Sequence, residues 1–135
     1  MQRDLENELK YSQMKAVRSQ VITGLLGRVH FDLPATAIAH ADALARAAAR
    51  IIDIGAASSN PDAKPVPPET EIARLAAVIP ALRKKGLSLS IDSFTPEVQR
   101  WAVAQGADYL NDIHGFPDPA LYPELASSPA KFIVR

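Results

Sequence analysis

Apolar and polar positions follow one another along the chain in blocks typical of a parallel α/β protein. Short apolar runs rich in β-branched residues predict strands, and longer stretches with apolar residues three or four apart predict helices. Strands are expected at residues 21–26, 50–55, 87–93, 107–112 and 131–135, and helices at 34–49, 69–85, 95–106 and 118–128. Because strand and helix alternate, the pattern indicates a parallel sheet covered by helices.

The beginning of the chain has a weaker pattern. Residues 1–20 are rich in charge and good helix formers, so they are expected to form a marginal helix or a disordered leader before a domain at residues 21–135. Gly27 to Leu33 is expected to be a connection. Pro80 is expected to kink the helix at 69–85 or to break it in two.

The most informative segment is residues 87–115, which we interpret as strand, helix and parallel strand. Each strand ends in a polar pair, Asp92-Ser93 in one and Asn111-Asp112 in the other. The carboxyl ends of parallel strands share one rim, where ligands bind. We therefore expect Asp92 and Asn111 to face one common space.

A second candidate site residue is Asp53, which lies among isoleucines in the run RIIDIG. A carboxylate there is costly unless it is paired, hydrogen-bonded or turned to water. It either accepts backbone N–H bonds or serves a site on the inner side of the strand, and we favour the site. The loop that follows carries Ser58, Ser59 and Asn60, whose groups suit an oxyanion or an aromatic acid, although such runs are also ordinary turns.

Composition narrows the class of protein. Lys plus Arg equals Asp plus Glu at 15 each, so no overall charge favours nucleic acid or an anionic membrane. Cysteine is absent, which excludes disulfides and thiolate metal sites. No apolar stretch is long enough to span a membrane, so a cytoplasmic protein is the default expectation. His40 and His114 are expected to have ordinary surface or turn roles.

From Arg50 onward the chain resembles dihydropteroate synthase. Three ordered segments with matching spacing carry the similarity: RIIDIGAASSNPD, SIDSFTPEVQ and YLNDIHGFPDPALYPELA. Asn60 stands where the family's loop arginine usually lies. That difference and the run NDIHGFPDPALYP look most like the mobile sulfonamide-resistance synthases.

This resemblance implies a fold, a reaction and roles for residues. The fold would be part of a (β/α)8 TIM barrel, with about four βα units and a fifth strand. The family reaction joins 4-aminobenzoate to 6-hydroxymethyl-7,8-dihydropterin pyrophosphate with help from magnesium. By resemblance, Asp92, Asn111 and Asp53 would bind the pterin. The loop residues Ser58, Ser59 and Asn60 would contact pyrophosphate and aminobenzoate.

The chain also departs from the family pattern. The first-strand motif N-x-T-x-D-S-F, which helps to hold magnesium and pyrophosphate, is replaced by VITGLLGR. We therefore assign no catalytic residue and no metal ligand, and expect a truncated or rearranged form without useful catalysis. Two alternatives remain, a pterin-binding remnant without turnover and a structural half-barrel whose role is assembly. Half a barrel would leave unpaired edges near Ile22 and Ile133, so self-association is expected.

Overall fold

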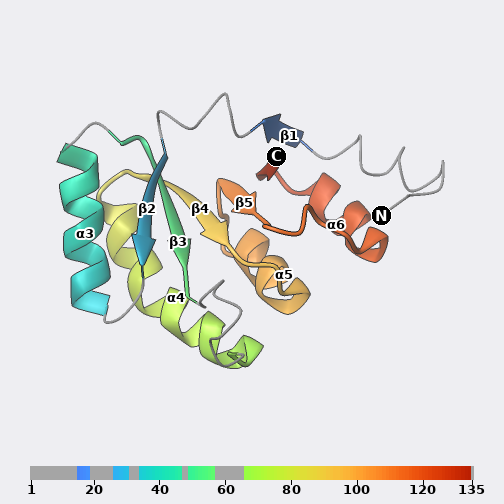
Figure 1. The fold of residues 1–135 in the computed structure, drawn as a ribbon, viewed down its shortest axis with the longest axis horizontal. Helices are drawn as coiled ribbons and strands as arrows, with labels where there is room; N and C mark the ends of the chain where they lie inside the picture. The colour runs from blue at the N-terminus through green and yellow to red at the C-terminus, as the bar shows by residue number, and fades with distance from the viewer. Residues whose placement is uncertain (1–14, 19–25, 31–33, 47–48, 57–65, 135) are drawn as a thin grey trace.

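The computed structural model describes residues 15–18, 26–30, 34–46, 49–56 and 66–134 (Figure 1). The strands in this part are β1 (Lys15–Arg18), β2 (Leu26–His30), β3 (Ile51–Gly55), β4 (Ser88–Asp92), β5 (Tyr109–Asn111) and β6 (Lys131–Val134). The helices are α3 (Pro34–Arg46), α4 (Pro68–Lys84), α5 (Pro96–Ala104) and α6 (Tyr122–Ser127), with a 3-10 turn, η2 (Pro119–Leu121), before α6. None of these helices is long and apolar enough to cross a membrane.

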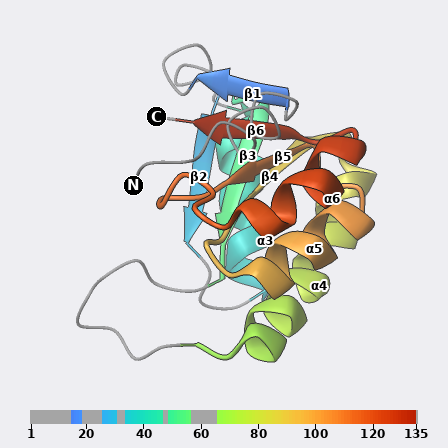
Figure 2. The same ribbon diagram turned by 90° about the vertical axis from the view of Figure 1, so that its right-hand side faces the viewer.

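All six described strands belong to one sheet in the order β1-β6-β5-β4-β3-β2. Every neighbouring pair is parallel. Figure 2 shows α3, α4, α5 and α6 together on one side of this sheet. The predicted parallel α/β architecture is therefore confirmed.

The alternating side chains of the strands separate the two faces of the sheet. One face packs on the helices and forms the main core. Its strand residues are all buried and apolar: Ile52, Ile54, Leu89, Ile91, Leu110 and Phe132. The opposite, inner face carries the intervening residues, which include Asp53, Ser90, Asp92 and Asn111. Polar residues are therefore concentrated on the face that the helices do not cover.

Helix α4 is one continuous helix, so the predicted alternative that Pro80 breaks it in two is wrong. The helix extends from Pro68 to Lys84 with Pro80 inside it. Pro80 is exposed, whereas Leu75, Val78, Ile79 and Leu82 are buried on both sides of it in the sequence. Packing of this stripe on the sheet outweighs the loss of one helical hydrogen bond.

The structure corrects the predictions for the beginning of the chain. The segment 27–30, expected to be a connection, belongs to β2, while residues 21–25 of the expected strand lie outside the described part. Lys15–Arg18, placed in a helical or disordered leader, is strand β1 and pairs with β6. The edge expected near Ile133 is therefore covered. In the described chain the sheet ends at β1 and β2, and Ile22 lies outside it.

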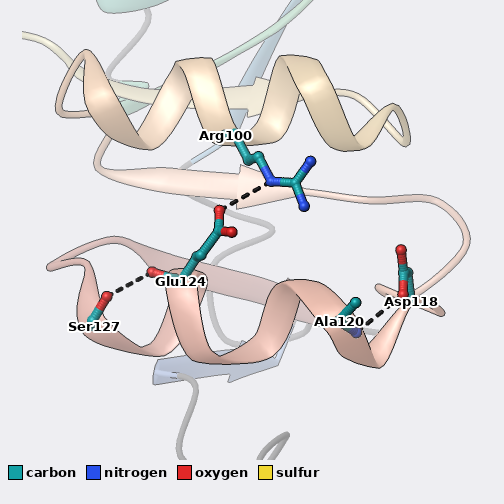
Figure 3. Close-up of polar contacts among 5 residues, drawn as sticks. All are labelled: Arg100, Asp118, Ala120, Glu124 and Ser127. Atoms are coloured by element: carbon teal, nitrogen blue, oxygen red, sulfur yellow. Dashed lines mark hydrogen bonds and ion pairs between the residues drawn. The ribbon is translucent and has the colours of Figure 1, made fainter.

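Short polar contacts hold the C-terminal helical segment (Figure 3). The Ala120 N–H donates to Asp118 Oδ1 at 3.0 Å, so Asp118 caps the η2 turn. Arg100 Nε of α5 donates to Glu124 Oε2 of α6 at 3.0 Å, and the Ser127 hydroxyl donates to the Glu124 carbonyl at 2.9 Å. The Arg100–Glu124 pair is exposed, so its contribution to stability is small.

Candidate functional site at the carboxyl ends of the strands

The strand register places the candidate site residues in two adjacent rows on the inner face. Asp53 of β3 is the register partner of Ser90 of β4, and both lie two residues before the carboxyl ends of their strands. Gly55, Asp92 and Asn111 form the next row, at the last positions of β3, β4 and β5. Parallel pairing thus brings the predicted residues Asp53, Asp92 and Asn111 to one side of one sheet.

Asp53 is the buried centre of this arrangement. Its side chain is 0% exposed, and its Oδ1 atom accepts a hydrogen bond of 2.7 Å from the Ser90 hydroxyl. The Asn111 amide Nδ2 donates to both Asp53 oxygens over a longer distance, 3.4 Å each. Hydrogen bonds of this kind offset the cost of burying a carboxylate. Asp53 therefore connects three strands through side chains.

These contacts orient the Asn111 amide so that its Nδ2 faces Asp53 and its Oδ1 points away from it. The residue is 2% exposed, and its Nδ2 is directed at Asp53. Its Oδ1 is buried and has no hydrogen-bond partner among the described residues. An unpaired buried acceptor costs about 1–3 kcal/mol. A ligand with an N–H donor at this point would recover that free energy.

Asp92 is the register partner of Asn111 and is more accessible, with intermediate burial. Its other neighbour in the row is Gly55, where a Cβ atom would lie 3.7 Å from Asp92 Oδ2. The glycine therefore leaves open the space beside the carboxylate. The Asp92 carboxylate and Asn111 Oδ1 are both hydrogen-bond acceptors, so together they suit a planar ligand with N–H donors along one edge.

Ser93, the residue after Asp92, takes part in hydrogen bonds that hold the turn after β4 in place. Ser93 Oγ donates to Glu71 Oε2 at 2.9 Å, and Thr95 Oγ1 donates to Glu71 Oε1 at 3.2 Å. Glu71 lies in the first turn of α4 and is 2% exposed. The Ser93 N–H donates to the Asn111 carbonyl at 3.1 Å. Glu71 thereby fixes the turn after β4 against the neighbouring strand end.

The segment after β3 is fastened at its start. Arg74 Nη1 donates to the Ala56 carbonyl at 2.8 Å, which ties the end of β3 to α4. The predicted loop residues Ser58, Ser59 and Asn60 lie outside the described part of the chain. Their proposed contacts therefore stay predictions.

Sequence reasoning did not single out Ser90, Glu71 or Gln99. Ser90 could have been found, because the run SLSID places Ser88, Ser90 and Asp92 at alternate positions of one strand. Glu71 lies in the first turn of α4, where the helix dipole favours an acid even at the surface, so nothing in the sequence marks it as buried. Among the described residues, no group of three or more His, Asp or Glu side chains could hold a metal ion.

Comparison with known proteins shows the family to which the chain belongs. The family described as "Pterin binding enzyme" matches residues 26–135, and the chain belongs to this family. The chain is similar to dihydropteroate synthase type-2 of Escherichia coli, with 54% identity over 101 residues, which is 75% of this chain and 37% of that relative. The predicted resemblance is confirmed.

Solved structures agree as well. The Burkholderia cenocepacia dihydropteroate synthase complexed with 7,8-dihydropteroate has a TM-score of 0.72 and 34% identity, covering 79% of this chain and 39% of that one. The Xanthomonas albilineans synthase with 4-aminobenzoic acid has a TM-score of 0.63 and 37% identity, covering 74% and 41%. The chain spans less than half of each. Its sheet is part of the (β/α)8 barrel of these enzymes, as predicted.

The role of Glu71 can be tested by a pair of substitutions on α4. Glu71→Ala removes the acceptor of the Ser93 and Thr95 hydroxyls and is expected to lower the free energy of unfolding by about 1–3 kcal/mol. Glu69→Ala is the control, since Glu69 is an exposed acid in the same first turn and shares the dipole effect. Urea unfolding measures both, and equal losses would contradict the assigned role.

Proposed function

We propose that this chain binds the pterin ring of a folate-pathway intermediate at the carboxyl ends of β3, β4 and β5. The observation that carries the proposal is the buried Asn111 Oδ1, which has no hydrogen-bond partner within the described part of the chain and lies beside Asp92 in the strand register. Membership of the pterin binding family supports it. So does the similarity to synthases solved with 7,8-dihydropteroate and with 4-aminobenzoic acid.

The chemistry of the ligand suits this pair of residues. A pterin presents adjacent N–H donors along one edge, and carboxylate and amide oxygens accept from such donors. Asp92 would accept from the donors at the open side, and Asn111 Oδ1 would accept from the donor that enters the buried side. Asp53 would act through Asn111, because it holds the amide in the required orientation.

We propose that Ser58, Ser59 and Asn60 contact pyrophosphate and aminobenzoate when both substrates are present. Magnesium assists the reaction in the family that the chain resembles. Within the part of the chain that the structure describes, no group of three or more His, Asp or Glu side chains could hold a metal ion. We therefore assign no metal ligand to them.

We further propose that this chain alone binds pterin without forming dihydropteroate at a useful rate. The sequence VITGLLGR stands in place of the family's first-strand motif, so the groups that stabilise a charged leaving group are missing there. The alternative is a half-barrel that serves assembly alone. Measurable condensation of aminobenzoate would overturn the first statement, and absence of pterin binding would favour the alternative.

The similarity to the type-2 synthase also supports a proposal about inhibitors. Asn60 in place of the usual loop arginine changes the group offered to the carboxylate of aminobenzoate. We propose that the intact site belongs to a sulfonamide-insensitive synthase.

The pterin site is tested by calorimetric titration with 6-hydroxymethylpterin-monophosphate. Asn111→Ala and Asp92→Ala are each expected to weaken binding about tenfold to a hundredfold, because each leaves donors of a desolvated ring unpaired. Arg100→Gln, on the exposed face of α5, should bind as the unaltered chain does.

Two results would contradict the proposal. One is binding of equal strength in all variants, which would place the ligand elsewhere. The other is no binding by the unaltered chain at millimolar ligand.

We also propose self-association of the chain through the edge at β2. This strand pairs only with β3 among the described strands, and an edge of parallel sheet is a template for pairing with another chain. Light scattering at micromolar concentration is expected to report a mass above that of one chain, which is 14.6 kDa. A stable monomer over a hundredfold dilution series would contradict this proposal.

A further inference from the structure

The two turns that follow Asp92 and Asn111 are each built around one polar side chain. In the turn after β4, Ser93 Oγ accepts from the Thr95 N–H at 3.2 Å. In the turn after β5, the Asp112 carboxylate accepts from the His114 N–H at 2.8 Å and from the Phe116 N–H at 3.2 Å. Each turn therefore has its own internal hydrogen bonds.

The second turn needs such support because its backbone is unusual. Phe116 has a φ of 56°, in the left-handed region that bulky residues rarely occupy. The Tyr122 hydroxyl donates to the Phe116 carbonyl at 2.6 Å, and the Phe116 ring packs edge-on against the Phe132 ring. The Asp112 carboxylate accepts from the Phe116 N–H as well, so it helps to hold this turn in place.

Gln99 joins the two turns. Its amide Nε2 donates to the Ser93 carbonyl at 2.8 Å and to Asp112 Oδ2 at 3.0 Å. The residue lies on α5, which connects the two strands, and is only 1% exposed. The rings of Phe94 and His114 also meet between them, but Phe94 is 47% exposed and this contact lies at the surface.

We propose that Gln99 is a positioning residue, which sets the spacing of Asp92 and Asn111 by holding the residue that follows each of them. This inference rests on the proposed pterin site and extends it. A planar ligand that donates hydrogen bonds to Asp92 on β4 and to Asn111 on β5 needs these two acceptors at a fixed separation. The bridge supplies that constraint at the covalent neighbours of both residues, 2.8 Å and 3.0 Å from one nitrogen.

The chemistry of the bridge favours glutamine. Both acceptors are buried oxygens, and a primary amide nitrogen carries two protons that can serve them together. A glutamate would face the Asp112 carboxylate with another carboxylate. An apolar side chain would remove a donor from the Ser93 carbonyl and would leave Asp112 Oδ2 with the Phe116 N–H in place of two donors. Val98 and Ala102 on the same helix pack in the core, so a buried glutamine among them would be unfavourable without these hydrogen bonds.

The test compares Gln99→Met with Val98→Ala in the full chain. Gln99→Met keeps the length of the side chain and removes both donors. Val98→Ala destabilises the same helix from the core and removes no side-chain hydrogen bond to either turn. Calorimetry with 6-hydroxymethylpterin-monophosphate, well below both thermal midpoints, should show roughly tenfold to a hundredfold weaker binding for Gln99→Met. Val98→Ala should bind as the unaltered chain does.

Amide hydrogen exchange measured by NMR without ligand tests the inference independently of pterin binding. In Gln99→Met the amides of Ser93, His114 and Phe116 should exchange faster together, and in Val98→Ala they should not change selectively. Failure of the unaltered chain to bind pterin would refute the proposed function and leave this exchange test standing.

Gln99→Asn supplies a second variant if the methionine chain does not fold. It keeps the amide but is one methylene too short to reach both oxygens, so it should also weaken binding and loosen one turn. The inference is overturned if binding and exchange in the glutamine variants match those of Val98→Ala.

Discussion

The structure depends on the burial of one carboxylate, that of Asp53, on the inner face of a parallel sheet. A fully buried acid is tolerated because Ser90 and Asn111 donate to it from the next two strands. The same contacts that offset the cost of burial also orient the Asn111 amide, whose Oδ1 accepts no hydrogen bond from any residue that the structure describes. The requirement to satisfy Asp53 and the availability of a ligand-binding acceptor are therefore two results of one hydrogen-bond arrangement.

Because successive side chains of a strand point to opposite faces of the sheet, adjacent residues at the strand ends have different roles. Asp92 and Asn111 lie on the inner face, while Ser93 and Asp112, one position later, turn toward the helices. Through these neighbours Glu71 and Gln99 fix the rim on which the site lies. The buried stripes of α4 and α5 anchor those two polar residues in turn, so packing on one face of the sheet determines geometry on the other.

Much of this arrangement could be predicted from the sequence, and the exceptions have physical reasons. Strong apolar periodicity located β3 to β6 and their helices, and the polar ends of β4 and β5 predicted that Asp92 and Asn111 lie side by side on one face of the sheet. Strand β1 was missed because its four residues form a strand only by pairing with β6, far away in the sequence. Residues 27–30 of β2 were missed because Gly27, Arg28 and His30 interrupt the apolar run, whereas backbone pairing with β3 decides the strand. The burial of Glu71 and Gln99 depends on tertiary packing that local pattern does not record.

The most direct measurement of the central claim is a crystal structure of the chain with 6-hydroxymethylpterin-monophosphate. The account predicts a ring nitrogen within about 3.2 Å of Asn111 Oδ1, further ring donors at the Asp92 carboxylate, and the Asn111 amide still directed at Asp53. A pterin bound away from these residues, or bound while Asn111 Oδ1 stays unpaired, would contradict it.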